Sequence, residues 1–349
     1  LTPKQALFLG ALATRLEKTG QDVLLTTRHY REVNQMLETK GHKAMVVGEH
    51  GGASIYRKLR VSALRISSLA KIIKKVKPSL AVSFSSPEAA RVAYGLSIPH
   101  YCISDSPHAT AVSKLSVPLS KRLFTPWIIP KTAWTKFGIF KQDITQYRAL
   151  DPVAWIRNLK PSGRIFEDLN LDEYRPIVTV RPEETYAAYL LEGNLVQRSV
   201  TEKVVQNLLK VRENLQIVIV GRYGHEFTRK WRGLGKQVIT PGSLVDGPSL
   251  VAHSSLFIGA GGTMTAEAAL LGVPAVSIYP AEPTFVERYL IRAGLVYRSL
   301  DPKRLAKACA KMMTDADFLE RYRKKSRSLL KTTEDPIAVI SRHVTKFEK

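Results

Sequence analysis

The chain has 349 residues, of which 44% are hydrophobic, and its formal net charge at pH 7 is +23. This length suffices for two domains with cores of their own, and the hydrophobic content is that of an ordinary globular protein. No apolar run approaches the roughly 20 residues of a membrane-spanning helix, and no signal peptide is visible. The two cysteines, Cys102 and Cys309, lie far apart in apolar segments, so we expect reduced core residues and a cytoplasmic protein, with any work at a membrane done from its surface.

The first half of the chain alternates helical and extended patterns, which is typical of a doubly wound parallel sheet. In chain order we expect helix 3–19, strand 22–27, helix 31–39, strand 43–47, helix 54–76, strand 79–84, helix 87–95 and strand 99–103. The opening helix has Thr2 as its N-cap and Pro3 in its first turn, and no strand comes before it. We therefore expect that the first strand of this sheet precedes Leu1.

The second half repeats the same alternation after a break. The periodicity fades and prolines appear over residues 156–175, which indicates a linker. We then expect strands 176–180, 215–220, 237–240, 256–258 and 274–279, helices 198–212, 247–253, 263–271 and 284–293, and further helices from residue 302 onward. The sequence therefore predicts an α/β protein with two Rossmann-like doubly wound domains, 1–155 and 176–330, that face a cleft, and a C-terminal helix within 331–349 that can pack back on the first domain.

A glycine-rich turn joins a strand to a helix in "SSLFIGAGGTMTAEAALLGVPAVSIYP", residues 254–280. Gly261 and Gly262 fall between the carboxyl end of the strand and the amino end of the helix, where unpaired backbone N–H groups and the helix dipole favour an anion. Thr263 and Glu267 add polar groups to the same helix. A tight turn without a ligand is the alternative, but the added polar groups favour a nucleotide or other anion site.

Other strand ends of the second half offer phosphate-binding groups at the same edge of the sheet. Arg181 follows the strand that ends at residue 180, and Gly221 and Arg222 follow the strand that ends at residue 220. An arginine at such an edge can bind phosphate with two parallel hydrogen bonds. The alternative for each is an ordinary surface arginine.

The sharpest catalytic candidate lies in the first half, in "YCISDSPHATAV". Asp105 and His108 follow a strand and are three residues apart, so the carboxylate can orient an imidazole that acts as a general base. The alternative is that Asp105 caps a turn and His108 is a solvated loop residue. No histidine or cysteine has the spacing of a metal-ligand cluster, so we expect no metal site.

The excess of basic residues suggests an anionic partner. Residues 50–87 contain eight bases and no acid, and residues 106–142 contain six bases and no acid. The second stretch interleaves its lysines with Trp127, Trp134, Phe137 and Phe140. This mixture fits an anionic membrane surface or a lipid-phosphate acceptor, and also nucleic acid. A basic solvated face with aromatic residues in the core is the alternative, and it is the expectation for most of these residues.

The glycine segment resembles the donor-binding segment of the glycosyltransferase B superfamily, and is similar to those of the peptidoglycan N-acetylglucosaminyltransferase and the non-hydrolysing UDP-N-acetylglucosamine 2-epimerases. Nearly the whole chain, including "SDSPHATAVSKLSVPLS" and "VTVRPEETYAAY", also resembles the domain of unknown function 354 family. The resemblance implies an acceptor-side first domain, a nucleotide-side second domain, a nucleotide diphosphate at the glycine turn and ribose hydroxyls held by Glu267. It implies a nucleotide-sugar substrate, and we expect neither a cofactor nor a metal.

The segment after Pro280 departs from the transferase pattern. That pattern usually supplies an acidic residue, a glutamine and an asparagine that hold the donor sugar, whereas this chain reads "AEPTFVERYL". Glu282 and Glu287 are the acidic candidates for sugar binding, and the paired glutamates of the epimerases are absent after the glycines. The sequence thus predicts a nucleotide-sugar glycosyltransferase or epimerase. A non-catalytic protein that holds nucleic acid or a membrane through its basic first half is the alternative.

Overall fold

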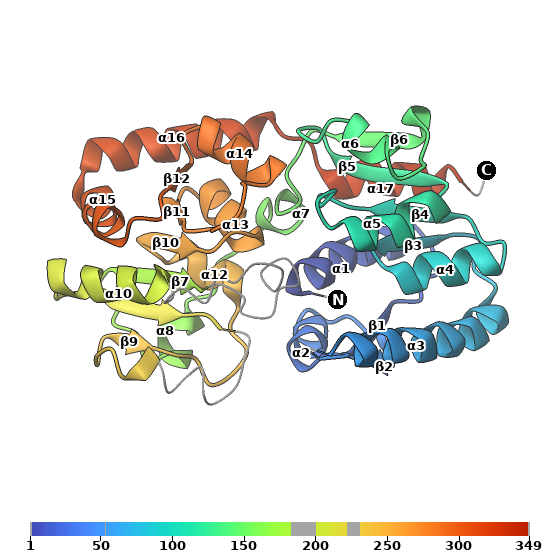
Figure 1. The fold of residues 1–349 in the computed structure, drawn as a ribbon, viewed down its shortest axis with the longest axis horizontal. Helices are drawn as coiled ribbons and strands as arrows, with labels where there is room; N and C mark the ends of the chain where they lie inside the picture. The colour runs from blue at the N-terminus through green and yellow to red at the C-terminus, as the bar shows by residue number, and fades with distance from the viewer. Residues whose placement is uncertain (1, 53, 183–199, 222–230, 348–349) are drawn as a thin grey trace. The chain divides into compact units, whose positions relative to one another are not determined.

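The computed structural model describes residues 2–52, 54–182, 200–221 and 231–347. The chain divides into two compact units, which are treated separately below. Unit 1 comprises Leu1–Trp155 together with Thr333–Lys349, and unit 2 comprises Ile156–Thr332. The C-terminal segment thus folds with the first half of the chain (Figure 1).

Unit 1 alternates strands and helices up to its sixth strand. Its elements are α1 (Pro3–Glu17), β1 (Thr26–His29), α2 (Arg31–Thr39), β2 (Met45–Glu49), α3 (Ile55–Val76), β3 (Ala81–Phe84), α4 (Pro87–Gly95), β4 (His100–Ile103), α5 (Thr110–Ser116), β5 (Arg122–Pro126), α6 (Thr132–Thr135), β6 (Ile144–Tyr147), α7 (Val153–Ile156) and α17 (Pro336–Thr345). The strands form two parallel sheets, one of order β1-β2 and one of order β3-β4-β5-β6.

Helices cover both faces of the β3-β4-β5-β6 sheet. On one face α1 packs against α17, and rings of α1 and of the C-terminal segment contact the sheet through the pairs Phe8–Phe84 and Phe124–His343. On the other face α4 packs between α3 and α5 and against β3 and β4. Strand β4, which is covered on both sides, is buried at every residue, whereas β2 is exposed at four of its five residues.

The second acid-free stretch forms elements that the sequence did not predict. Strand β5 lies within it and strand β6 follows it, and its aromatic residues divide between core and surface. Trp134 is fully buried and Phe137 is 7% exposed, whereas Phe140 is 72% exposed. Trp134 and Phe137 are thus core residues, as expected for a basic solvated face over core aromatics, whereas Phe140 lies on the surface.

Unit 2 contains one six-stranded parallel sheet of order β12-β11-β10-β7-β8-β9. Its elements are α8 (Arg164–Asp168), β7 (Ile177–Arg181), α10 (Val200–Val211), β8 (Gln216–Ile219), β9 (Val238–Ile239), α12 (Gly247–Ala252), β10 (Leu256–Gly259), α13 (Thr263–Leu271), β11 (Ala275–Ser277), α14 (Phe285–Arg292), β12 (Val296–Arg298), α15 (Pro302–Thr314) and α16 (Ala316–Thr332). The chain changes direction across the sheet between β7 and β10: β8 and β9 follow on one side, and β11 and β12 follow on the other. Ligands of doubly wound sheets bind at such a switch point, beyond the carboxyl ends of the strands.

The core of unit 2 joins the sheet to its helices. Val204 and Leu208 of α10 and Leu305 of α15 pack on buried residues of β7, β8, β10 and β11. The segment 156–175, which the sequence indicates as a linker, contributes Ile165 and Leu169 to a second cluster in this unit. In the described part of the chain, no helix is both long and apolar enough to cross a membrane.

Candidate functional site

The glycine turn lies where the sequence predicts it, between β10 and α13 at the switch point of unit 2. Gly261 and Gly262 have φ angles of 87° and 90°, which side chains other than glycine rarely adopt. A Cβ on Gly261 would lie 2.9 Å from the ring of Tyr279, whereas a Cβ on Gly262 would meet no atom within 4 Å. The start of α13 is therefore open to a ligand at Gly262, which is exposed.

The first turns of α13 carry the polar side chains of this site. Thr263 is half-buried, and Thr265 and Glu267 are each 3% exposed. The Oγ1 atom of Thr265 is buried and has no hydrogen-bond partner among the described residues. This atom faces strand β10, since a Cβ on Gly259 would lie 2.8 Å from it.

Arg181 ends strand β7 and lies in register with Gly259 of β10, as a switch-point residue should. Its guanidinium Nη1 donates a 2.8 Å hydrogen bond to the carbonyl of Val220, so the side chain ties the end of β7 to the end of β8. Gly221 follows Val220 and is exposed. Arg222 lies outside the described residues, so its role as a phosphate ligand stays a prediction.

The two acidic sugar-binding candidates lie in different surroundings. Glu282 is exposed, whereas Glu287 is 5% exposed and accepts a short hydrogen bond from the hydroxyl of Ser277. Burial raises the pKa of Glu287, although the Ser277 hydroxyl and the charge of Arg298 act against the rise. Glu287 thus joins α14 to the end of β11.

Arg298 is a residue of this region that the sequence did not single out. Its Nη2 donates hydrogen bonds of 3.1 and 3.0 Å to the carbonyls of Tyr279 and Ala281, and so orders the segment after β11. The backbone N–H of Tyr279 also donates to the Ser277 hydroxyl at 3.2 Å. Because the ring of Tyr279 lies against Gly261, these bonds hold one wall of the glycine turn.

The catalytic candidate of unit 1, Asp105, belongs to a buried ionic cluster. Lys4, in the first turn of α1, forms a short ion pair with Asp105 and a 2.6 Å ion pair with Asp151. The hydroxyl of Tyr147 donates a 2.5 Å hydrogen bond to the other carboxylate oxygen of Asp151, and Ser106 donates one of 2.8 Å to Asp105. The carboxyl ends of β4 and β6 bring these groups to one edge of the sheet.

The charges of this cluster shift its pKa values in opposite directions. Burial raises the pKa of Asp105, but the Lys4 ammonium outweighs burial and the pKa lies below its ordinary value. Burial raises the pKa of Asp151 to about 6 against the attraction of Lys4. Burial and the charge of Asp151 raise the pKa of Tyr147 well above its ordinary value. Asp105 is thus the carboxylate of the cluster that stays ionised, and Asp151 is the one that takes up a proton first.

His108 is exposed, whereas the carboxylate with which the sequence pairs it is 17% exposed. Burial of part of the ring lowers the pKa of His108, and Asp105 acts against this shift by its charge. Asp105 also binds Lys4 and Ser106, and its role in orienting the imidazole of His108 stays a prediction. Among the residues that the structure describes, no group of three or more His, Cys, Asp and Glu side chains could hold a metal ion.

Solved structures of similar fold cover nearly the whole chain. The UDP-GlcNAc 2-epimerase of Neisseria meningitidis, in a structure bound to UDP-GlcNAc, is 15% identical, with a TM-score of 0.70, and the match covers 99% of this chain and 97% of that one. The spinosyn forosaminyltransferase SpnP is 17% identical, with a TM-score of 0.63, and the match covers 100% and 97%. These likenesses confirm the predicted glycosyltransferase-B-like fold of two Rossmann-like halves.

The relatives in sequence agree over the same length. An uncharacterized protein of Methanocaldococcus jannaschii, MJ0665, is 30% identical over 307 residues, which are 85% of this chain and 85% of that protein. The family model described as "Protein of unknown function (DUF354)" matches residues 2–349. The chain therefore belongs to the DUF354 family, as the motifs of its sequence indicate.

Proposed function

We propose that this protein binds a nucleotide-diphosphate sugar at the glycine turn of unit 2 and acts on it as a glycosyltransferase or a sugar epimerase. The observation that carries the proposal is the exposed Gly262 at the start of α13, next to the switch point between β7 and β10. Backbone N–H groups at a helix start bind phosphate well. The solved epimerase of similar fold, whose structure holds UDP-GlcNAc, supports a UDP-sugar as the first ligand to test.

The residues of unit 2 then have separate roles. The diphosphate lies at the turn of Gly261, Gly262 and Thr263, with Gly221, Arg181 and Arg222 at the neighbouring strand ends. Glu267 accepts hydrogen bonds from the ribose hydroxyls, and Glu282 and Glu287 face the sugar. These donors neutralise the departing diphosphate, so we expect neither a metal nor a cofactor to take part.

Asp105 is the acid–base group of the proposed reaction. In a transfer, its carboxylate takes the proton of the acceptor hydroxyl while the acceptor oxygen bonds to the sugar and the nucleoside diphosphate leaves with the electrons of the broken bond. The ammonium of Lys4 lowers the pKa of Asp105, so this carboxylate is ionised at neutral pH but is a weaker base than an ordinary aspartate. His108 is the second candidate for this role, since its ring is exposed.

A thermal-shift panel of nucleotides and nucleotide sugars tests the proposal. A ligand at about 100 times its dissociation constant stabilises a protein by roughly 2.7 kcal/mol, which is readily measured. We expect a response to at least one uridine or other pyrimidine diphosphate compound. Flat curves over the whole panel would count against nucleotide-sugar binding. Proton NMR of the responding sugar, with and without acceptor alcohols, then separates epimerisation from transfer.

One observation favours a membrane surface as a further partner of unit 1. The first turns of α3 expose Ile55, Tyr56 and Leu59, at 83%, 74% and 70%, within the stretch 50–87 that has eight bases and no acid. Exposed apolar and basic residues on one helix are typical of contact with anionic lipid. Binding to liposomes should grow with anionic lipid and weaken with salt. Binding that ignores lipid charge, or that appears with nucleic acid instead, would reject this partner.

A further inference from the structure

A buried arginine of helix α3 contacts both strands of the β1-β2 sheet. Arg65 is 7% exposed. Its Nη1 donates a 2.9 Å hydrogen bond to the carbonyl of Thr27 in β1 and a short hydrogen bond to the carbonyl of Val47 in β2. A buried guanidinium is costly unless it is paired and hydrogen-bonded. The two strands therefore hold this cation in a fixed place.

The pairing of the two strands is irregular beside Arg65. The register shifts between two consecutive pairs, Thr27–Val46 and His29–Glu49. Strand β2 thus has two residues, Val47 and Gly48, opposite the single residue Arg28, as in a β-bulge. Gly48 has a φ of 75°, and a Cβ on it would lie 3.2 Å from the Cβ of Arg65. A glycine at this position therefore lets α3 and its arginine approach the strand.

Arg28 brings a second guanidinium to the same place. The residue is half-buried, and its Nε is buried without a hydrogen-bond partner among the described residues. Native proteins rarely leave such a donor unpaired. Burial lowers the pKa of Arg65, Glu88 acts against this fall, and the positive charge of Arg28 adds to it. The two guanidinium groups are therefore close enough for their charges to repel each other.

The acid whose charge acts on Arg65 is Glu88, which follows the carboxyl end of β3. Glu88 accepts hydrogen bonds of 3.1 Å from the hydroxyl of Ser62 and 3.2 Å from that of Ser86. Glu49 of β2 is exposed and pairs with Arg57 at 3.5 Å. Glu88 can balance one of the two arginines, so one positive charge remains at this place among the described residues.

We propose that Arg28 and Arg65 bind one oxyanion, a phosphate or carboxylate group of a ligand, beside the bulge of β2. The anion accepts hydrogen bonds from the guanidinium of Arg28 and balances the remaining positive charge. Guanidinium groups bind both kinds of oxyanion through charge-assisted hydrogen bonds. His29 and Gly48 are exposed, so the place is open to solvent.

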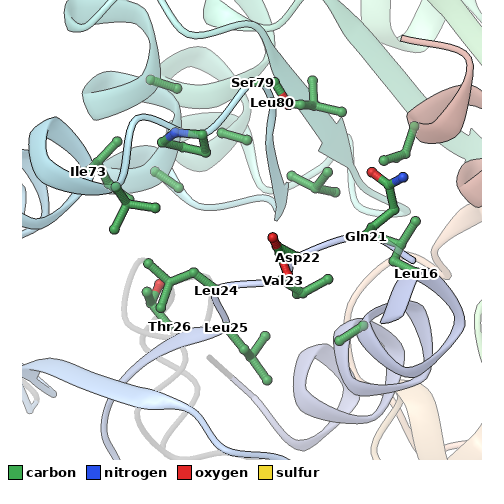
Figure 2. Close-up of a pocket in the computed structure, with 18 of the residues that line it drawn as sticks. Leu16, Gln21, Asp22, Val23, Leu24, Leu25, Thr26, Ile73, Ser79 and Leu80 are labelled. Carbon is green, nitrogen blue, oxygen red and sulfur yellow. The ribbon is translucent and has the colours of Figure 1, made fainter. Parts of the chain in front are cut away.

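This oxyanion site differs from the apolar pocket of unit 1, which has a volume of about 560 Å³. Residues 22–26 and 79–82 line that pocket, and Figure 2 shows Leu25 and Leu80 there. These segments lead into β1 and β3, whereas Arg28 lies in the second half of β1. The oxyanion site also belongs to a different unit from the glycine turn, so it binds a second anionic group besides the diphosphate proposed for unit 2.

Titration of the full chain with inorganic phosphate tests the proposal, with sodium chloride at equal ionic strength as the reference. NMR follows the arginine Nε–H signals and the backbone amide of Gly48, while the amides of Gly261 and Gly262 report phosphate bound at the glycine turn. We expect saturable shifts of the Arg28 and Gly48 signals. Their absence in the folded chain would overturn the proposal, whatever the glycine turn binds.

A parallel titration with acetate distinguishes the two kinds of oxyanion. The anion that saturates the shift of Gly48 at the lower concentration is the one that the site selects. Either preference supports the site, since both anions share the chemistry that the two arginines recognise.

Substitutions of two arginines show which charge the anion needs. Arg28→Gln removes one guanidinium of the site, whereas Arg57→Gln removes a 59% exposed one from α3. Arg28→Gln should weaken phosphate binding at Gly48 by about ten- to hundredfold, because a charge-assisted contact is lost. Arg57→Gln should change it by less than about twofold. Arg28→Lys keeps the charge and should lose less affinity than Arg28→Gln. Equal phosphate affinities in Arg28→Gln and Arg57→Gln would overturn the proposal.

Discussion

The ammonium of Lys4 lies 2.6 Å from a carboxylate oxygen of Asp151, and the same ammonium pairs with Asp105. Lys4 belongs to the first turn of α1, whereas the two carboxylates follow strands β4 and β6. One buried cation therefore fixes the start of a helix to two strand ends. The contact with Asp151 is the more deeply buried, since the Asp151 side chain is 1% exposed and that of Asp105 is 17% exposed.

Replacement of Lys4 by methionine should leave two buried carboxylates without their cation. Breaking a buried pair in this way costs about 3–5 kcal/mol, because the remaining charge is uncompensated. We expect a loss of this size in the free energy of unfolding at pH 7, measured by urea denaturation. Lys4→Arg, which keeps the charge, is the matched control and should lose less. A loss below about 1 kcal/mol in Lys4→Met would show that water enters the cluster.

The raised pKa of Asp151 predicts how stability depends on pH. Its carboxyl has a pKa of about 6 in the folded protein and 3.8 as the ordinary value, so the folded state binds this proton more tightly. The free energy of unfolding should therefore rise as pH falls from 7 through 6 towards 4. Asp105 acts in the opposite sense, because its pKa is lowered and its stabilisation is lost below about pH 4.

Denaturation curves between pH 4 and pH 8 measure this dependence. Asp151→Asn should remove the rise between pH 7 and pH 4, because the side chain no longer titrates. Asp168→Asn changes an exposed aspartate and serves as the control. A rise of unchanged size in Asp151→Asn would assign the titration to another group.

The sequence predicted the glycine unit well because its signals are local. A short apolar run, glycines at the turn, a helical stretch and a proline after it all fall within about 25 residues of one crossover, and the structure has β10, α13 and β11 there. Strands β5 and β6 were missed because their sequences, "RLFTP" and "ITQY", are short, contain polar residues and show no clear alternation.

The ionic cluster of unit 1 could not be predicted in full for a different reason. Lys4, Asp105, Tyr147 and Asp151 come from separate elements, and only the strand order brings them together. Asp105 could be identified as a candidate from the sequence because it follows a predicted strand. A lysine in the first turn of a helix is usually solvated, so nothing in the local pattern of Lys4 indicates burial.

Alanine substitutions at two glycines can separate backbone strain from ligand binding. Gly262 and Gly20 have φ angles of 90° and 84°, and a Cβ at either would meet no atom within 4 Å. Each substitution should therefore cost a similar amount of stability, about 1–2 kcal/mol. Only Gly262→Ala should weaken nucleotide binding in calorimetry, because its methyl group lies where the phosphate approaches. Equal nucleotide affinity in both variants would remove the phosphate from this turn.

The acidic residues after β11 can be separated by stability and by sugar binding. Glu287→Ala removes the acceptor of the buried Ser277 hydroxyl and should cost about 1–3 kcal/mol of unfolding free energy. Glu282→Ala changes an exposed side chain and should leave stability within about 0.5 kcal/mol. If Glu282 contacts the sugar, its variant weakens binding of a nucleotide sugar but not of the bare nucleotide diphosphate. Equal effects on both ligands would exclude that contact.

Glu267 tests whether the site of unit 2 holds a ribose. It lies about one turn into α13 and is 3% exposed, so its carboxylate is shielded from water where it would meet the hydroxyls. Glu267→Gln keeps the shape of the side chain but weakens a charge-assisted hydrogen bond of roughly 1.5–3 kcal/mol, which is about ten- to hundredfold in affinity. Ribonucleotides should lose more affinity than 2′-deoxyribonucleotides, because the deoxy sugar already lacks one of the two hydroxyls. Calorimetry of both proteins with both ligands measures the difference. The same loss for both sugars would mean that Glu267 supports the helix and that the glycine turn binds phosphate without it.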